Sequence, residues 1–203
     1  MNADNFAKMD ENYDDIHLDS YKIILFTRSM NPVLFDMSDS LLDIPFRHIP
    51  LKNTSAISYF YELLKYDPDY AINIDEDAFL LDRDALLRLL KFCIKNDIVN
   101  CGIPDGGLGS PRAFNPVVTN PFFNIFNIKE IKKAFTPEVL NELDFTEADF
   151  ERLLPTSLLR SPYRYVKDAE PYYSFFLWMA KNLKTYYLDI TLHKDGKSWV
   201  VKD

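Results

Sequence analysis

The sequence predicts an α/β domain with a mostly parallel central sheet that is flanked by helices. Three observations predict it. Short apolar segments rich in β-branched and aromatic residues alternate with helical patterns over about 80 residues, from residue 21 to residue 103. The length of 203 residues suits one domain. A hydrophobic content of 47% and a charged content of 27% supply a sizeable core and exclude wholesale disorder.

The first predicted elements are two strands and the helix that follows them. The run 21–27 is apolar and β-branched, which is typical of a buried strand, and a second strand is expected at 46–50. A helix should then begin after Asn53 or Thr54, since either side chain can cap it. It should end just before Pro68, because proline disfavours helical backbone in the residue that precedes it.

The next segments continue the alternation. A strand at 70–74 ends at an acidic triplet, Asp82 can cap a long helix over 83–95, and a further strand is expected at 98–103. Strands that alternate with helices in this way form βαβ units, in which neighbouring strands run parallel.

The second half of the chain is less regular. Residues 115–127 mix phenylalanine, asparagine and proline without a clean period. The elements expected beyond them are helix starts at Thr136 and Thr146, an aromatic helix at 172–183, a strand at 186–193 and a closing strand at 198–201.

The formal net charge of −8 is concentrated at the amino-terminal end. The first 20 residues hold six acidic side chains and one basic side chain, so the remaining 183 residues carry a net charge of only −3. We therefore expect an acidic arm over 1–20 ahead of a single domain over 21–203. Neither part has the basic surface that a nucleic-acid-binding protein needs, so no nucleic-acid partner is expected.

Cysteine usage and hydropathy predict a cytoplasmic protein. Cys93 and Cys101 lack the spacing of metal ligands and are expected to be reduced core thiols. No apolar run reaches the roughly 18 residues of a membrane span, so no transmembrane segment is expected. The acidic start also lacks the apolar stretch of a secretory signal.

The sharpest chemical feature is Asp75-Glu76-Asp77, directly after the predicted strand at 70–74. In open α/β sheets, ligands bind beyond the carboxyl ends of the strands. Two carboxylates this close repel each other unless a cation lies between them. Mg²⁺ or Mn²⁺ accepts such oxygen ligands and can share the rest of its shell with a diphosphate. The alternative is a solvated acidic turn in which Asp77 or Asp82 only caps the next helix.

With this motif, the order of elements resembles the GT-A fold of the nucleotide-sugar glycosyltransferases. In that family a short Asp-x-Asp motif holds a divalent metal on the diphosphate of a nucleotide-sugar, and the matching residues here are Asp75 and Asp77. The resemblance covers about residues 21–200. It implies a nucleotide-sugar-binding half at 21–105 and an acceptor-side half at 106–203.

The resemblance also implies roles for residues outside the motif. The residues that it places on the nucleotide-sugar are Thr27, Arg28, Asn53, Ser55 and Glu76. His193, at the end of a predicted strand, would be a further metal ligand, unless it is a surface histidine in a hairpin. Glu170, or as second choice Asp168, would be the catalytic carboxylate. The family often has two adjacent acids here, whereas Pro171 follows Glu170, and helix-start acids can also be ordinary caps.

Two further segments carry candidate residues. The glycine-rich loop at 104–112 lacks both the P-loop ending and the dinucleotide-binding spacing. The resemblance places Asp105 and Arg112 of this loop on the donor-sugar side of the cleft. The stretch 120–124 suits sugar hydroxyls and ring faces, but it suits a packed loop equally well.

The predicted function is metal-dependent transfer of a sugar from a nucleotide-diphospho-sugar to a hydroxyl group of a glycan or another acceptor, with Mn²⁺ or Mg²⁺ as the cofactor. Two alternatives stay open. One is a catalytically inactive, transferase-like scaffold that binds a nucleotide or glycan. The other is a haloacid-dehalogenase-like phosphatase with Asp75 as its nucleophile, although the residues after Asp77 depart from the pattern of that family.

Overall fold

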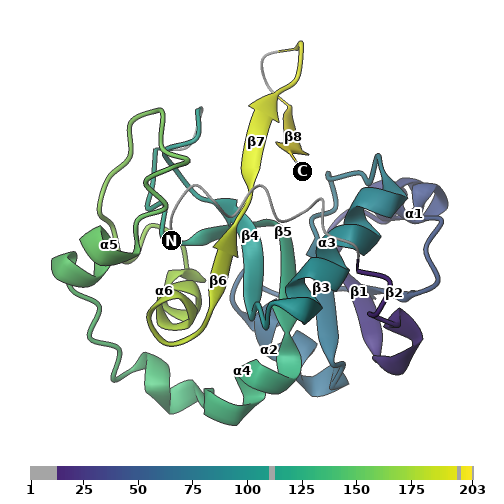
Figure 1. Ribbon diagram of the computed structural model, residues 1–203, viewed down its shortest axis with the longest axis horizontal. Coiled ribbons are helices and arrows are strands. Elements are labelled where there is room, and N and C mark those ends of the chain that lie inside the picture. Colours follow the sequence, from purple (N-terminus) through teal and green to yellow (C-terminus); the bar gives the residue numbers. More distant parts are fainter. Residues whose placement is uncertain (1–12, 110–112, 196–197, 203) are drawn as a thin grey trace.

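The structure, a computed structural model, describes residues 13–109, 113–195 and 198–202. The strands are β1 (Ile23–Arg28), β2 (Arg47–Leu51), β3 (Tyr70–Ile74), β4 (Asn100–Pro104), β5 (Thr119–Asn127), β6 (Thr185–Tyr187), β7 (Asp189–Leu192) and β8 (Trp199–Lys202). The first six strands form one sheet in the order β2-β1-β3-β5-β4-β6. Strands β7 and β8 form a separate hairpin that projects from the body of the molecule (Figure 1).

The helices are α1 (Pro32–Leu41), α2 (Ser58–Tyr66), α3 (Arg83–Lys95), α4 (Ile128–Ala134), α5 (Glu147–Leu153) and α6 (Tyr173–Asn182), with short 3-10 turns η2 (Leu18–Ser20) and η3 (Pro137–Leu140). Apolar residues of α2, α4, α5 and α6 share one core cluster with one face of the sheet. The apolar residues of α3 pack with the other face (Figure 1).

The predicted α/β class with a mostly parallel sheet is confirmed. Strand pairs β1–β2, β1–β3 and β4–β6 are parallel. Strand β5 is antiparallel to both of its neighbours, β3 and β4. The start of β5 therefore meets the carboxyl ends of β3 and β4, and this edge of the sheet is called the carboxyl edge below. The opposite edge, where β3 begins and β5 ends, is called the amino edge.

Alternation along the central strands separates the two cores. Ile24 and Phe26 of β1 face α2 and α6, whereas Ile23 and Leu25 face the side of α3. The first core is strongly aromatic: the ring of Phe60 lies 5.0 Å from the ring of Phe175 in a stacked arrangement. The second core contains Cys93 and Cys101, which are buried and free as predicted.

Several elements differ from the sequence prediction. Helix α1 and strand β5 were not expected. Helix α2 begins at Ser58 with Ile57 as its N-cap, and neither Asn53 nor Thr54 caps it. The reason is local, because Asn53 has a positive φ of 57° and a bend precedes the helix. The strand expected at 186–193 is interrupted at Leu188, so that β6 stays in the sheet and β7 leaves it to pair with β8.

The described part of the acidic arm, residues 13–20, is packed against the domain and is not loose. Tyr13 is buried and its ring meets Phe92 of α3 edge-on. Asp15 forms an ion pair with Lys95, with 2.5 Å between the charged atoms.

The described residues contain no helix that is both long enough and apolar enough to span a bilayer.

Candidate functional site

A polar cavity of about 180 Å³ lies at the carboxyl edge of the sheet. Five separate segments supply its walls: the end of β1, the turn and first residues of α2, the end of β3, the start of β5 and the segment before α6. The lining residues are Arg28, Ala56, Tyr59, Asn73, Asp75, Asn120, Pro121, Glu170 and Tyr172. Arg28, Asp75 and Glu170 were each singled out from the sequence, and the fold brings all three to one cavity.

The cavity is small relative to sites that enclose a whole ligand, which are typically about 300–1,000 Å³. It has room for a phosphate, ribose or sugar portion of a larger molecule. Two larger cavities lie elsewhere. One of about 290 Å³ beneath the β7–β8 hairpin is lined almost entirely by apolar side chains. One of about 360 Å³ lies among α5, α6 and β6. Neither of the two gathers acids and bases as the carboxyl-edge cavity does.

Asp75 is the half-buried carboxylate of the cavity. It follows β3 directly, and its backbone N–H donates a hydrogen bond of 3.0 Å to the carbonyl oxygen of Phe122. Burial raises the pKa of the Asp75 carboxyl, and the negative charge of Asp77 raises it further. A hydrogen bond from the N–H of Glu76 and the positive charge of Arg28 oppose this shift without cancelling it.

Asp77 and Glu76 occupy different positions from Asp75. Asp77 is exposed and is not part of the cavity wall, although its charge is felt by Asp75. The Glu76 carboxylate accepts hydrogen bonds of 2.7 Å from the backbone N–H groups of Met30 and Asn31. Glu76, expected on the nucleotide-sugar, therefore ties the loop after β1 to the loop after β3, and the cavity does not include it.

Arg28 and Thr27 end the same strand but face different surroundings. The guanidinium of Arg28 lines the cavity and forms no ion pair with another described residue. Thr27 is fully buried, and its hydroxyl lies 2.9 Å from Nε2 of His48. Nδ1 of His48 lies 2.8 Å from a carboxylate oxygen of Asp39. The structure therefore places Thr27 in a buried polar chain behind the loop, away from the cavity.

Glu170 lines the opposite side of the cavity from the sheet strands, in the segment that leads into α6. Its carbonyl oxygen accepts a hydrogen bond of 3.1 Å from the N–H of Tyr173, the first residue of that helix. Tyr172 is the N-cap residue and makes no side-chain cap. Asp168, the second choice as catalytic carboxylate, is exposed and does not reach the cavity wall.

Tyr59 is a site residue that the sequence analysis missed. It belongs to the first turn of α2, is 2% exposed, and lines the cavity. Its hydroxyl has no hydrogen-bond partner among the described residues. Burial, together with the negative charge of Asp75, raises the pKa of Tyr59 well above its usual value. A buried hydroxyl without a partner is costly, which makes Tyr59 a candidate donor to a ligand of the cavity.

The cavity wall formed by β3 and β5 is fixed by a buried amide network. The side-chain amide of Asn73 donates a hydrogen bond of 2.6 Å to the carbonyl oxygen of Pro121. The side chain of Asn120 donates a hydrogen bond of 2.6 Å to the carboxylate of Asp105 and accepts one of 2.9 Å from the N–H of Phe122. A polar residue inside the apolar run 70–74 was the available sequence signal for Asn73.

Asp105 stands behind this wall and is fully buried. Besides Asn120, it accepts a hydrogen bond of 2.5 Å from the hydroxyl of Tyr173. Burial and the negative charge of Asp105 raise the pKa of Tyr173 far above its usual value, so the phenol keeps its proton. Asp105 therefore supports the cavity without lining it. Arg112, the other candidate of this loop, lies outside the described residues.

Three further predicted residues also lie away from the cavity. Asn53 is exposed in the bend before α2. The hydroxyl of Ser55 is paired with Ser58, 2.8 Å away, at the start of the helix. His193 is 57% exposed in the turn of the β7–β8 hairpin, 3.7 Å from the carboxylate of Asp195. Within the described ranges, no group of three or more His, Cys, Asp or Glu residues is placed to hold a metal ion.

Comparison with known proteins adds little to this geometry. No protein-family model matches the chain, and no curated protein matches it. A search of solved structures finds the mannosyltransferase PcManGT from Pyrobaculum calidifontis, in complex with GDP-Man and Mn²⁺, with a TM-score of 0.45 and 8% sequence identity. The match covers 76% of this chain and 59% of that chain, so this chain spans less than two thirds of the other protein's length. The likeness is one of coarse fold alone.

Proposed function

We propose that this chain is a metal-dependent glycosyltransferase that takes its sugar from a nucleotide-diphospho-sugar. The observation that carries the proposal is the convergence of Arg28, Asp75 and Glu170 on one cavity at the carboxyl edge of the sheet. A cation, a half-buried carboxylate and a second carboxylate are the groups needed to bind a diphosphate and to activate a hydroxyl group. Ligands of open α/β sheets bind at this edge.

The residues fit a hard divalent cation such as Mn²⁺ or Mg²⁺. Asp75 and Asp77 offer carboxylate oxygens, and the repulsion that raises the pKa of Asp75 is one that a cation would relieve. No third acid or histidine joins them among the described residues, so a diphosphate and water would complete the coordination shell. Bound there, the cation would stabilise the negative charge that develops on the departing diphosphate.

The chain's own residues take three roles in this proposal. Arg28, which forms no ion pair with another residue of the described ranges, binds phosphate oxygens, for which the planar donors of its guanidinium are suited. The unpartnered hydroxyl of Tyr59 donates a hydrogen bond to the same ligand. Glu170 accepts the proton of the acceptor hydroxyl as a general base. Asn73 and Asn120 shape the wall and have their amide donors already engaged.

Thermal stability with added ligands tests the binding half of the proposal. We expect a uridine or guanosine diphosphate with Mn²⁺ to raise the melting temperature by about 5–10 °C near saturation, with much smaller effects from either component alone. Asp75→Asn and Arg28→Gln should remove the shift, each measured against its own unliganded melting temperature. Glu142→Gln, an exposed acid outside the cavity, is the matched control and should keep it. Absence of a metal-dependent shift with every nucleoside diphosphate would refute the proposal.

Turnover separates an enzyme from a scaffold. With a nucleotide-sugar and Mn²⁺, the wild-type chain should release the nucleoside diphosphate, and Glu170→Gln should bind as tightly while losing about 100-fold or more in rate. Binding without turnover in the wild type would favour the inactive scaffold. Hydrolysis of a generic phosphoester that requires Asp75 would favour the phosphatase instead.

A further inference from the structure

Helix α1 (Pro32–Leu41) presents its apolar residues to solvent. Val33, Met37 and Leu41 are 64%, 52% and 58% exposed, and Met30, just before the helix, is 65% exposed. The only fully buried residue of the helix is Ser38. Residues four apart are neighbours on a helix surface, so these side chains form one stripe and are not scattered. Isolated exposed apolar residues are ordinary, whereas a contiguous row of them marks an interaction surface.

The helix is held firmly with this stripe outward. Asn31 caps it by accepting hydrogen bonds from the N–H groups of Val33 and Leu34. The hydroxyl of Ser38 donates to the carbonyl oxygen of Ala78, 3.4 Å away, and the ring of Phe35 lies 4.5 Å from the ring of His48. These contacts fix the opposite side of the helix to the domain. The stripe is therefore a fixed surface of the fold, and helix α1, which carries it, lies at the outer end of the molecule (Figure 1).

The segment that carries the stripe is acidic, although Arg83 pairs with one of its aspartates and His48 with another. Between Ser29 and Phe46 the chain has no lysine or arginine, and it has three aspartates, Asp36, Asp39 and Asp43. Asp36 is exposed on α1, and the carboxylate of Asp43 is 94% exposed, 3.1 Å from Arg83. An anionic membrane or a second copy of this face would bring like charges together, which is unfavourable. A basic surface would be attracted.

We infer that the α1 face, defined by Val33, Met37 and Leu41 with the flanking Asp36 and Asp43, binds a basic amphipathic helix of a partner protein. The apolar stripe would pack against the apolar side of such a helix, as two amphipathic helices do when they lie side by side. The aspartates would face its lysines or arginines. This inference does not depend on the proposed transferase activity, because α1 does not line the carboxyl-edge cavity.

Two synthetic peptides of identical leucine and lysine composition, each 14 residues long, test the inference. In one the leucines follow helical spacing, and in the other the order is scrambled. Both carry the same charge, so only the first can offer an apolar stripe. Fluorescence anisotropy with the full chain should show about tenfold or more tighter binding of the periodic peptide. Equal affinity for the two peptides would overturn the inference, since charge alone would then explain binding.

Variants locate the contact on the chain. Val33→Ser/Met37→Ser/Leu41→Ser should abolish the preference for the periodic peptide, and the single variant Met37→Lys should weaken it with no change in fold. Leu192→Ser, which removes an apolar residue that is 48% exposed on the hairpin, is the control and should keep the preference. A preference that persists in the triple variant would overturn the inference. Two other results would also overturn it. One is a wild-type dimer that the triple variant converts to a monomer, and the other is binding to anionic vesicles that the triple variant loses.

Discussion

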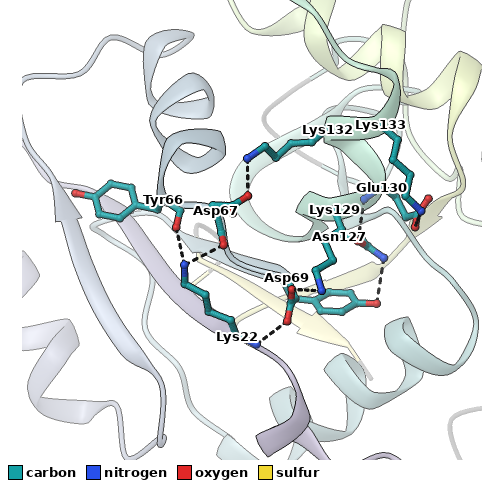
Figure 2. A network of polar contacts seen from close by, with 10 residues as sticks. Lys22, Tyr66, Asp67, Asp69, Asn127, Lys129, Glu130, Lys132 and Lys133 are labelled. Atoms are coloured by element: carbon teal, nitrogen blue, oxygen red, sulfur yellow. Dashed lines mark hydrogen bonds and ion pairs between the residues drawn. The ribbon is translucent and has the colours of Figure 1, made fainter.

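The two edges of the central sheet differ in whether their carboxylates form ion pairs. At the amino edge, each of the three carboxylates drawn in Figure 2 has a lysine beside it. Asp67 lies 2.5 Å from Nζ of Lys132, and Asp69 lies 2.6 Å from Nζ of Lys129. At the carboxyl edge, Asp75 feels the positive charge of Arg28 without pairing with it, and neither Asp75 nor Asp77 forms an ion pair with another described residue.

The pKa values record this difference. The hydrogen bond and positive charge of Lys132 lower the pKa of Asp67, whereas burial and Asp77 raise the pKa of Asp75. Paired charges hold loops together, while uncompensated charges in a cavity cost stability unless a ligand compensates them. The amino edge therefore fastens the domain, whereas the carboxyl edge leaves the charge of Asp75 uncompensated, as the proposed ligand site requires.

The largest effect should come from the carboxylate behind the cavity. Asp105→Ala would leave the Tyr173 hydroxyl and the Asn120 amide without their buried acceptor, at a cost of about 3 kcal/mol, or about 6–12 °C in melting temperature. Asp105→Asn, which keeps the volume and one acceptor, should lose less. Thermal unfolding monitored by circular dichroism measures both. An Asp105→Ala variant with the melting temperature of the wild type would contradict the idea that the buried hydrogen bonds of Asp105 stabilise the cavity wall.

A smaller loss is expected at the amino edge. The Asp69 carboxylate is 15% exposed and accepts 2.7 Å from the backbone N–H of Lys22 while it faces Lys129. Asp69→Ala should destabilise the fold by about 2 kcal/mol in chemical unfolding, because a charge-assisted hydrogen bond is lost. Asp69→Asn keeps an acceptor oxygen and should lose about half as much. Equal losses in the two variants would mean that the retained acceptor oxygen contributes nothing, and an Asp69→Asn variant as stable as the wild type would mean that the charge contributes nothing.

The smallest expected change in stability is an increase, and it should come from Asp75. Asp75→Asn should stabilise the unliganded chain at pH 7, by about 1 kcal/mol, since it removes a carboxylate whose pKa is raised by folding. An acid with a raised native pKa costs stability above that pKa and costs nothing below its unfolded value of about 3.9. The gain should therefore fade as the pH falls from 7 towards about 4.

Asp67→Asn is the matched control for this pH dependence. Because the pKa of Asp67 is lowered in the folded state, its carboxylate contributes stability at neutral pH that is lost as the pH falls. The variant should melt slightly below the wild type at pH 7 and approach it in acid. The measurement is the melting temperature of the wild type, Asp75→Asn and Asp67→Asn between pH 7 and about 4. Shifts of the same sign for both variants would contradict the contrast between the edges.

Elements that bury an apolar side could be predicted from the sequence. Strand β3 and helix α3 lie at 70–74 and 83–95 as expected, and Asp82 caps α3 by accepting from the N–H of Ala85. Helix α1 was missed because its apolar residues face solvent, so no inward stripe marks it, although Asn31 and Pro32 are a typical helix start. Strand β5 was missed because its buried residues include asparagines with polar partners: Asn124 donates to the hydroxyl of Thr119 in the same strand, and Asn127 donates to the hydroxyl of Tyr70 in β3.

The candidate site was predicted in part. Arg28, Asp75 and Glu170 end or precede regular elements at the expected edge, which sequence order and sheet topology together indicate. Thr27 was misplaced relative to the cavity because alternation along β1 turns it away from Arg28. Tyr59 carried no sequence signal, since an aromatic residue on the inner side of a helix is ordinarily core.

Strand β5 has a consequence for how the two edges are linked. It carries Asn120 at the cavity wall and, at its other end, Asn127, which caps α4 by accepting from the N–H of Glu130 (Figure 2). Because the strand is central and continuous, its position relative to β3 and β4 sets both ends together. A shift of this strand by two residues relative to β3 and β4 would disrupt both the carboxyl-edge cavity and the polar network of the amino edge. Only one register of β5 is therefore compatible with both features.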